Sequence, residues 1–259
     1  MTLRGQTAVV TGASQGIGRE ISVALAENGA NLVLAARSAE ALAETRGLVE
    51  GQGGEALVVP TDLREPGEVD ALASAALERF GSVELLVNNS GVEGPTAALQ
   101  DISPEEWASV LDINLTGAFL CCRALLPSMI ERGAGSIVMI GSVLARRPVF
   151  GRTPYAASKL ALVALAHNLA TEVGPSGIRV NVVSPGAVEG PRLDKVFQAQ
   201  AEANDVTLEQ VREQYTGLSP LRAMVTARDV AEAVVFLAGP RASKVTGEDL
   251  NVTAGLVMY

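Results

Sequence analysis

The sequence contains few residues that cross-link chains or hold metals: it has two cysteines and one histidine in 259 residues. Cys121 and Cys122 are adjacent, so they are poorly placed to form a disulfide with each other or to build a metal cage. We expect them to be small apolar helix residues in a reducing compartment. His167 lies in an apolar helical stretch, which favours a structural role. The chain is therefore neither a disulfide scaffold nor predicted to hold a metal.

Basic residues are also few: 20 lysines and arginines face 29 acidic residues, for a net charge of -9. This balance argues against nucleic acid and against anionic membrane surfaces as partners. We find no uninterrupted apolar run long enough to span a bilayer, because Lys159, His167 and Asn168 interrupt the best candidate. The first strand-like segment follows Met1 so closely that no room remains for a signal peptide. We therefore expect a cytoplasmic protein.

Hydrophobic residues, by contrast, are abundant at 48%, and charged residues amount to 19%. The length fits one large domain over residues 1–259, and there is no low-complexity linker, long charge run or internal repeat. Short β-branched segments alternate with helical patterns, which predicts parallel strands joined by crossover helices.

The expected strands are Thr7–Thr11, Asn31–Ala36, Ala56–Pro60, Glu84–Asn88, Ser136–Ile140, Arg179–Val183 and Asp249–Val252. The expected helices are Gly16–Asn28, Ala39–Glu50, Pro66–Phe80, a long region Pro104–Glu131, and Tyr155–Val173. This order predicts an α/β fold, a single doubly wound Rossmann-type domain with a parallel sheet of about seven strands. Its ligand crevice would lie at the carboxyl ends of the strands.

Two of the helical stretches are too apolar for an outer layer in water. Ile113–Leu126 has only Arg123 as a charge, and Tyr155–Val173 has only Lys159 and Glu172. A helix on a sheet ordinarily has one polar face. We therefore expect the outer faces to pack against another subunit in a homo-oligomer, a dimer or tetramer. Burial by the chain itself is the alternative.

A glycine-rich turn, Thr11–Gly18, joins the first strand to its helix. Glycines let the backbone approach a pyrophosphate, and the helix N-terminus offers free amide donors. The spacing is GxxxGxG and not the GxGxxG of many dinucleotide binders. A simple strand-to-helix connector is the alternative. The candidate cofactor contacts in this turn are Gly12, Ser14, Gln15, Gly16, Ile17 and Gly18.

The end of the second strand indicates which dinucleotide is bound. NAD-binding folds usually have an acid there, whereas this chain has Arg37 followed by Ser38. An arginine binds a 2′-phosphate through charge-assisted hydrogen bonds, so NADP is preferred and NAD remains possible. An ordinary exposed arginine is the alternative. Asp62, with its neighbour Leu63, is a candidate acceptor for the adenine amino group, and helix capping is the alternative for Asp62.

Tyr155 and Lys159 are four residues apart in a predicted helix, and Ser142 precedes the tyrosine by thirteen residues. This spacing places the phenol and the ammonium on one helix face. A nearby ammonium stabilises the phenolate, which lets a tyrosine exchange a proton near neutral pH.

Together these motifs resemble the short-chain dehydrogenase/reductase family over nearly the whole chain. Thr11–Gly18 is similar to the family's cofactor loop, and Asn88-Asn89-Ser90-Gly91 to its Asn-Asn-Ala-Gly segment. Asn114, Ser142, Tyr155 and Lys159 match its catalytic tetrad in order and spacing. The resemblance implies further cofactor contacts at Asn88, Ser90, Gly91, Tyr155, Lys159, Pro185, Gly186 and Val188.

The resemblance also implies a reaction. Tyr155 would give its proton to a carbonyl oxygen as hydride leaves the nicotinamide, and Ser142 would hydrogen-bond the same oxygen. Lys159 would assist the tyrosine and hold the nicotinamide ribose, and Asn114 would maintain a water-mediated proton route. One departure is Gly190, where family members often have a threonine that contacts the carboxamide.

Substrate contacts are predicted in two segments. Residues 190–220 form a long polar connection, which we expect to be a partly helical substrate lid. The second segment lies between Ser142 and Tyr155. The candidate substrate contacts in and next to these two segments are Leu144, Arg146, Arg147, Arg152, Glu189, Arg192, Asp194, Lys195 and Phe197. Three arginines between Ser142 and Tyr155 suggest an anionic substrate. Solvent-facing charge or subunit-interface pairing is the alternative.

The favoured function is an NADP-dependent oxidoreductase acting on a secondary alcohol or ketone. An NAD-dependent dehydrogenase of a polyol, sugar or hydroxy acid is the enzymatic alternative. A dinucleotide-sensing regulatory protein is the non-enzymatic one, and an epimerase or lyase that uses the cofactor transiently is a third possibility.

Overall fold

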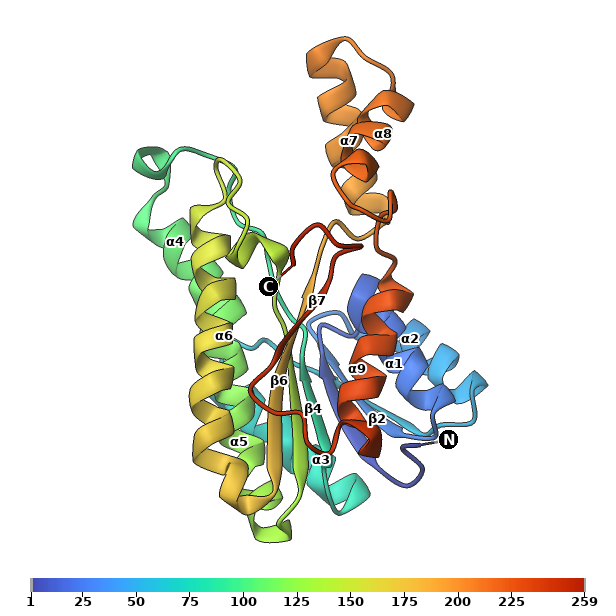
Figure 1. Cartoon of the computed structure of the whole chain (residues 1–259). Helices are drawn as coiled ribbons and strands as arrows, with labels where there is room; N and C mark the ends of the chain where they lie inside the picture. The colour runs from blue at the N-terminus through green and yellow to red at the C-terminus, as the bar shows by residue number, and fades with distance from the viewer. Residues whose placement is uncertain (1, 259) are drawn as a thin grey trace.

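A computed structural model of the chain describes residues 2–258, apart from the side chains of Arg192, Ala199 and Ala203. Within these residues, seven strands form one parallel sheet of order β3-β2-β1-β4-β5-β6-β7 (Figure 1). The strands are β1 (Thr7–Thr11), β2 (Asn31–Ala36), β3 (Ala56–Pro60), β4 (Leu85–Asn88), β5 (Gly135–Ile140), β6 (Ile178–Pro185) and β7 (Asp249–Val252). The predicted Rossmann-type sheet is confirmed. The main difference is β6, which continues two residues further, to Pro185.

The sheet is wound in both directions from its centre. Val9 of β1 pairs with Val33 of β2 on one side and with Leu86 of β4 on the other. The chain builds outward from β1 to β3 and then from β4 to β7. The direction of winding therefore changes between β1 and β4, and the ligand crevice of such sheets lies at the carboxyl ends of these strands.

Helices cover both faces of the sheet, which explains why its central strands are apolar throughout. α1 (Gly16–Glu27), α2 (Ala39–Gly51) and α9 (Ala227–Ala238) contribute to one buried layer. α3 (Pro66–Phe80), α5 (Gly117–Arg132) and α6 (Thr153–Val173) contribute to the other. Cys121 and Cys122 lie buried in the second layer as predicted, and burial raises the pKa of the Cys122 thiol to about 12. His167, in contrast, is exposed.

The long helical region after β4 is not a uniform α-helix. It consists of α4 (Pro104–Leu111), a π-helical turn over Asp112–Thr116, and α5. A π-turn adds a residue to the helical repeat and changes the direction of the side chains. Asn114 lies in this turn and is buried. The sequence pattern predicted helix here but contained no signal for the π-turn.

The helical run Pro104–Arg132 is long and apolar enough, by length and composition alone, to cross a membrane. This run overlaps the expected helical region Pro104–Glu131, whereas the best candidate for a membrane span in the sequence was the stretch that Lys159, His167 and Asn168 interrupt. Its apolar residues have a place in the fold, because Leu120, Leu125 and Met129 are buried in the layer that packs on the sheet. Core helices commonly have this composition.

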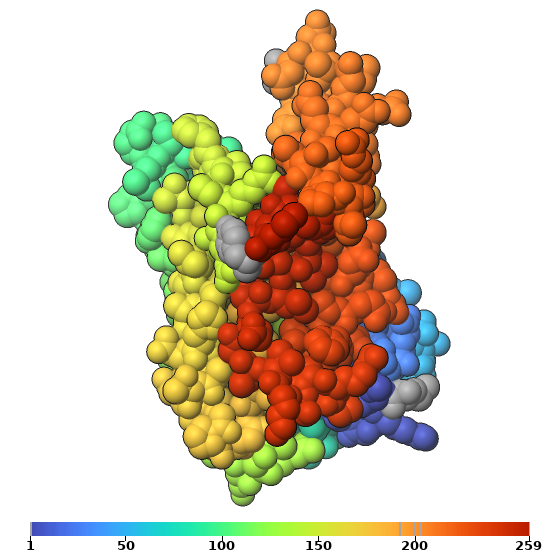
Figure 2. Space-filling model, in the orientation of Figure 1, coloured from blue at the N-terminus to red at the C-terminus, as the bar shows by residue number. Residues whose placement is uncertain are grey.

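Two further helices form the segment after β6. α7 (Pro191–Asn204) and α8 (Leu208–Gly217) rise beyond the carboxyl ends of the strands, above the rest of the molecule (Figures 1 and 2). Phe197, Ala201 and Val211 are buried between them in a small cluster of their own. Residues 190–220 are thus partly helical, as expected for this segment.

Candidate active site

The glycine turn after β1 is tied to the loop after β4. The Thr11 hydroxyl accepts hydrogen bonds from the backbone N–H groups of Asn89 and Ser90, each at 3.0 Å. In return, the Asn89 Nδ2 atom donates to the carbonyl oxygens of Thr11, at 2.9 Å, and Gly12, at 3.2 Å. Asn89 thus fixes the turn, and sequence reasoning did not assign it a role. The sequence feature that could have indicated this role is the position of Asn89 within the Asn88–Gly91 segment.

Close packing in this turn requires glycine. Gly12 has φ of +65°, and a Cβ there would lie 2.8 Å from Asn89 Nδ2. A Cβ on Gly18 would collide with the carbonyl oxygen of Gly12. Gln15, the N-cap of α1, makes no side-chain capping bond, and the first turn has no acidic residue. The first turn of α1 therefore has free amide donors and no opposing acidic charge, and the side chains that contact this turn bind its carbonyl oxygens, which fits a pyrophosphate.

Two arginines line one cavity of about 500 Å³ beside the ends of β2 and β3. They are Arg37, which is exposed, and Arg64, which sequence reasoning missed. The Arg64 Nε atom lies 3.0 Å from Asp62 Oδ1, and the hydrogen bonds from Arg64 lower the pKa of Asp62 to about 2. Asp62 offsets the charge of Arg64, so Arg37 is the remaining positive group at the ends of these two strands. Glu105 and Glu106, in the first turn of α4, also line the cavity, so its lining is not positive as a whole.

Two neighbouring residues have structural partners. The Ser38 hydroxyl accepts a hydrogen bond from Ala41 N at 3.2 Å and caps α2. The Leu63 side chain is buried, and a Cβ on Gly117 would lie 2.8 Å from Leu63 Cβ. The Leu63 side chain therefore has a packing role, and its predicted contact with the cofactor would have to come from its backbone.

The second cluster forms where β5 ends and α6 begins. Ser142 follows β5, and its hydroxyl accepts a hydrogen bond from Leu144 N at 3.2 Å. Lys159 is buried, and its Nζ atom donates to the carbonyl oxygen of Ile140 at 2.8 Å. The same Nζ atom lies 5.7 Å from the centre of the Tyr155 ring. The hydrogen bond to the end of β5 thus holds the positive charge of Lys159, a residue of α6, beside the tyrosine.

Asn114 connects this cluster to the loop after β4. Its Nδ2 atom donates to Val92 O at 2.9 Å and to Ser158 Oγ at 3.0 Å, and its Oδ1 atom accepts from Val92 N at 2.8 Å. Ser158 in turn donates to Tyr155 O at 2.7 Å. Ser158 is a second residue that sequence reasoning missed, although its position beside Lys159 in the helix was visible.

Gly91 leaves the space between two of these groups open. A Cβ at Gly91 would lie 3.3 Å from both Asn114 Oδ1 and Lys159 Nζ. The amide and the ammonium therefore border the same small space at the end of β4. In the same region Asn88, at the end of β4, is buried and its Nδ2 atom lies 3.4 Å from Cys122 Sγ.

The chain leaves β6 along the edge of the same crevice. Gly186 N donates to Val252 O at 2.9 Å, and Val188 forms a bridge with Val225. Gly190 has φ of 147° and ψ of 175°, a backbone conformation that is essentially confined to glycine. A threonine cannot occupy this position without a change in the backbone. The departure from the family pattern thus follows from the way the chain enters α7.

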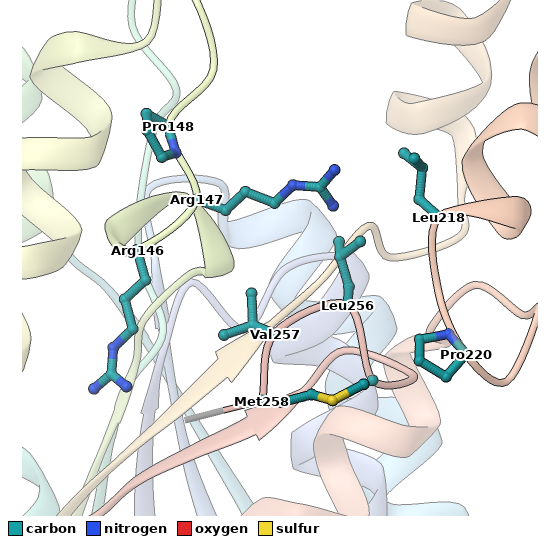
Figure 3. A pocket seen from close by; sticks show the side chains of 9 residues that line it. Arg146, Arg147, Pro148, Leu218, Pro220, Leu256, Val257 and Met258 are labelled. Atoms are coloured by element: carbon teal, nitrogen blue, oxygen red, sulfur yellow. The ribbon is translucent and has the colours of Figure 1, made fainter.

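The arginines after Ser142 have different surroundings. Arg146 lies 2.9 Å from Asp249, whose side chain is 3% exposed, and Arg152 lies 3.3 Å from Glu93. Arg147 points the other way, into a cavity (Figure 3). Arg146 and Arg152 therefore form ion pairs within the chain, an arrangement that we did not predict from the sequence. Leu144 is half-buried.

Two residues of the segment 190–220 that we predicted to contact substrate have other partners instead. Phe197 is fully buried, 4.7 Å from the centre of the Tyr215 ring, and Asp194 forms an ion pair with Arg212. The lid helices have no sheet to pack on, so they bury their own apolar residues. Lys195 and Glu189 are exposed, whereas the Arg192 side chain lies outside the described residues.

Known proteins share this architecture and sequence. A family model described as enoyl-(acyl carrier protein) reductase matches residues 12–257. The 3-oxoacyl-(acyl-carrier-protein) reductase FabG of Vibrio cholerae is 34% identical over 258 residues, which cover 100% of both chains.

Solved structures agree with this similarity. Actinorhodin polyketide ketoreductase with NADPH is 38% identical with a TM-score of 0.92, covering 98% of each chain. NAD⁺-bound xylitol dehydrogenase is 30% identical with a TM-score of 0.92, covering 98% of this chain and 100% of the other. The chain therefore belongs to the short-chain dehydrogenase/reductase family and is an NAD(P)-dependent oxidoreductase.

Proposed function

We propose that the protein is an NADP-dependent ketoreductase that interconverts a ketone and a secondary alcohol. One observation carries this proposal: the buried Lys159 ammonium lies 5.7 Å from the Tyr155 ring, at the carboxyl ends of β4 and β5. Beside it, the glycine turn offers a site for a dinucleotide. A proton donor and a dinucleotide site at one edge of the sheet suit carbonyl reduction.

Each residue has a separate part in the proposed reaction. The bound nicotinamide supplies or accepts the hydride. Tyr155 donates a proton from its hydroxyl to the carbonyl oxygen, while the Lys159 charge stabilises the phenolate that remains. The Ser142 hydroxyl donates a hydrogen bond to the same oxygen, where negative charge develops.

Asn114 is a positioning residue in this scheme. Its three hydrogen bonds hold the loop after β4 against α6 and thereby keep the space beside Lys159 open. A water in that space would carry protons between Lys159 and solvent. Proton transfer by a positioned side chain typically contributes about 10²- to 10⁴-fold to the rate, which is the contribution that this proton route would support.

The preference for NADP rests on charge at the end of β2. Arg37 and Arg64 line one cavity, and the carboxylate nearest to Arg64 is neutralised by it. A 2′-phosphate would gain charge-assisted hydrogen bonds there, whereas NAD has no group to use them. The ketoreductase with NADPH among the similar structures supports this choice.

The enzymatic alternative is an NAD-dependent dehydrogenase of a polyol, sugar or hydroxy acid. The likeness to NAD⁺-bound xylitol dehydrogenase favours it, and Arg37 alone does not prevent NAD from binding. The ketoacyl reductase at 34% identity over the full length favours the reductive reaction on a ketone.

The test is a panel of ketones and secondary alcohols assayed with NADPH, NADH and their oxidised forms. The proposal predicts that one NADPH is consumed per ketone reduced, with kcat/KM higher for NADPH than for NADH. A higher value for NADH would identify the alternative dehydrogenase. Turnover without net cofactor consumption would indicate an epimerase or lyase, and tight cofactor binding without turnover a dinucleotide sensor.

We also propose that the enzyme is a homo-oligomer and that α7 and α8 act as its substrate lid. Phe119 on α5 and Leu160 on α6 are 46% and 51% exposed, which supports a subunit contact on these helices. The lid helices stand at the carboxyl ends of the strands, where substrate would enter.

A further inference from the structure

A cavity of about 490 Å³ lies between the loop after Ser142, the end of the lid and the C-terminal segment. Most of its lining is apolar, with Leu218 and Pro220 on the lid side and Leu256 and Val257 on the C-terminal side (Figure 3). Such a lining accommodates an aliphatic chain, but it gives a charged group nothing to pair with.

Arg147 is the side chain that breaks this apolar lining. Its guanidinium points across the cavity toward Leu256 and Leu218 (Figure 3). Arg146, whose backbone also borders the cavity, directs its guanidinium the other way, to Asp249.

The charge of Arg147 is not balanced within the part of the chain described here. Arg147 is half-buried, and in residues 2–258 it forms no ion pair. No acidic side chain lines the described walls of the cavity. The other two arginines of the same loop both have carboxylate partners. Unlike Arg146 and Arg152, Arg147 thus has its guanidinium in a mostly apolar cavity and has no carboxylate partner among the described residues.

We propose that Arg147 binds an anionic group, a carboxylate or phosphate, at the far end of the ketone substrate. This inference rests on the proposed ketoreductase function and adds a substrate class to it. A guanidinium matches carboxylate and phosphate oxygens in a planar, bidentate geometry, and partial burial strengthens the interaction. In a chain with a net charge of -9, an anionic substrate needs such a local positive group.

The position of Arg147 also limits the shape of the substrate. It follows Ser142 by five residues, so the two Cα atoms are at most about 18 Å apart. The short helical turn Val143–Ala145 reduces this separation further. The anion of a substrate whose carbonyl lies at Ser142 should therefore lie within this reach, joined to the carbonyl by an aliphatic linker along the apolar walls.

The test uses pairs of ketones in which one member has an anionic group and the other does not. One series consists of 4-oxopentanoate, 6-oxoheptanoate and 8-oxononanoate, each compared with its methyl ester. A second pair is acetoacetyl-coenzyme A and acetoacetyl-N-acetylcysteamine, which share the keto thioester, while only the first has phosphates, together with adenosine and a longer arm. The ratio of kcat/KM for the charged over the neutral member is measured with NADPH.

Arg147→Ala should lower this ratio by about tenfold or more, and Arg147→Lys should retain most of it, because a charge-assisted hydrogen bond is lost only in the first variant. Arg241→Ala is the matched control, since Arg241 is an exposed arginine in the turn after α9, at the other end of the sheet, and should not alter the ratio. A fall confined to the acid series identifies a carboxylate, and one confined to the coenzyme A pair a phosphate.

An Arg147→Ala ratio equal to that of the wild type in both sets would overturn the inference while leaving the ketoreductase proposal intact. Calorimetric titration of the same acids and of coenzyme A into the NADP⁺-bound protein tests the anion site without turnover. Binding that Arg147→Ala weakens supports the site even if no ketone in the panel is reduced. Absence of Arg147-dependent binding in that titration would also overturn it.

Discussion

Three hydrogen bonds fix the Asn114 side chain between the loop after β4 and α6, and two of them go to the backbone of Val92. Asn114→Ala would leave the partly buried N–H and carbonyl of Val92 without these partners. We expect it to lower the free energy of unfolding by about 1–3 kcal/mol, measured by urea denaturation.

Asn168→Ala is the control, because Asn168 is exposed on α6 and makes one hydrogen bond, to Ala164 O. It should change stability by less than about 0.5 kcal/mol. Equal effects of the two variants would show that Asn114 does not hold these elements together.

A second residue-scale prediction concerns the pair of Asp62 and Arg64. The pair lowers the pKa of Asp62 to about 2, so its contribution to stability is present above the ordinary value of 3.8 and is lost as the pH falls toward 2. Arg64→Ala should return the pKa of Asp62 toward 3.8, measured by NMR titration of the carboxyl carbon.

The same variant should weaken NADPH binding more than NADH binding, because the freed Asp62 charge would oppose the 2′-phosphate. Arg46→Ala removes an exposed arginine that pairs with Glu50 within α2, and should leave both affinities unchanged. A fall of equal size for the two cofactors would contradict the proposed role of this pair.

At the residue scale, the sequence indicated which side chains could carry out proton transfer, but it did not indicate which residues form ion pairs with one another. Lys159 and Tyr155 could be paired by their spacing on a helix, because the period of a helix is fixed. The partners of Arg146 and Arg152 are far away in sequence, on β7 and in the loop after β4. No local pattern indicates such contacts, so the three arginines looked equivalent until the structure separated them.

At the scale of elements, the glycine turn after β1 depends on close backbone contact. A Cβ on Gly18 would collide with the carbonyl oxygen of Gly12, whereas a Cβ on Gly67, in α3, would meet nothing within 4 Å. We expect Gly18→Ala to weaken NADPH binding by about tenfold or more, since overpacking of this kind costs about 1–3 kcal/mol. Fluorescence titration of NADPH measures the effect.

Gly67→Ala should leave NADPH affinity unchanged and should not lower the melting temperature. If Gly18→Ala bound NADPH as tightly as the wild type, the glycine turn would not be the dinucleotide site.

The boundaries of elements show which local signals were sufficient. Prolines and glycines marked α3, whose limits Pro66 and Phe80 agree with expectation. The π-turn at Asp112–Thr116 was not foreseen, because the partners of its residue Asn114, Val92 and Ser158, are distant in sequence and no local pattern indicates them. Phe197 was misjudged for a similar reason: the sequence shows an aromatic residue in a polar segment but not that α8 buries it.

At the scale of the molecule, the doubly wound parallel sheet could be predicted because alternating strands and helices permit few arrangements. The number of subunits and the surface that they would share could not be predicted in this way. Phe119 and Leu160 lie on adjacent helices and are about half exposed. We expect the double variant Phe119→Glu/Leu160→Glu to shift the protein to a smaller species in sedimentation velocity, because two charges would be buried without partners.

Leu48→Glu provides the comparison, since Leu48 is similarly exposed, at 47%, but lies on α2 on the other face of the sheet. It should sediment like the wild type. A wild type that sediments as a monomer would rule out the proposed subunit contact.

The central claim about the whole enzyme is that the Tyr155 hydroxyl, assisted by Lys159, supplies the proton to the carbonyl oxygen. Tyr155→Phe tests it most directly, because the ring beside Lys159 remains and only the oxygen is removed. We predict that ketone-dependent NADPH oxidation falls by roughly 100-fold or more while the Kd for NADPH stays within about twofold. Turnover close to that of the wild type would contradict the account, since another group would then have to supply the proton.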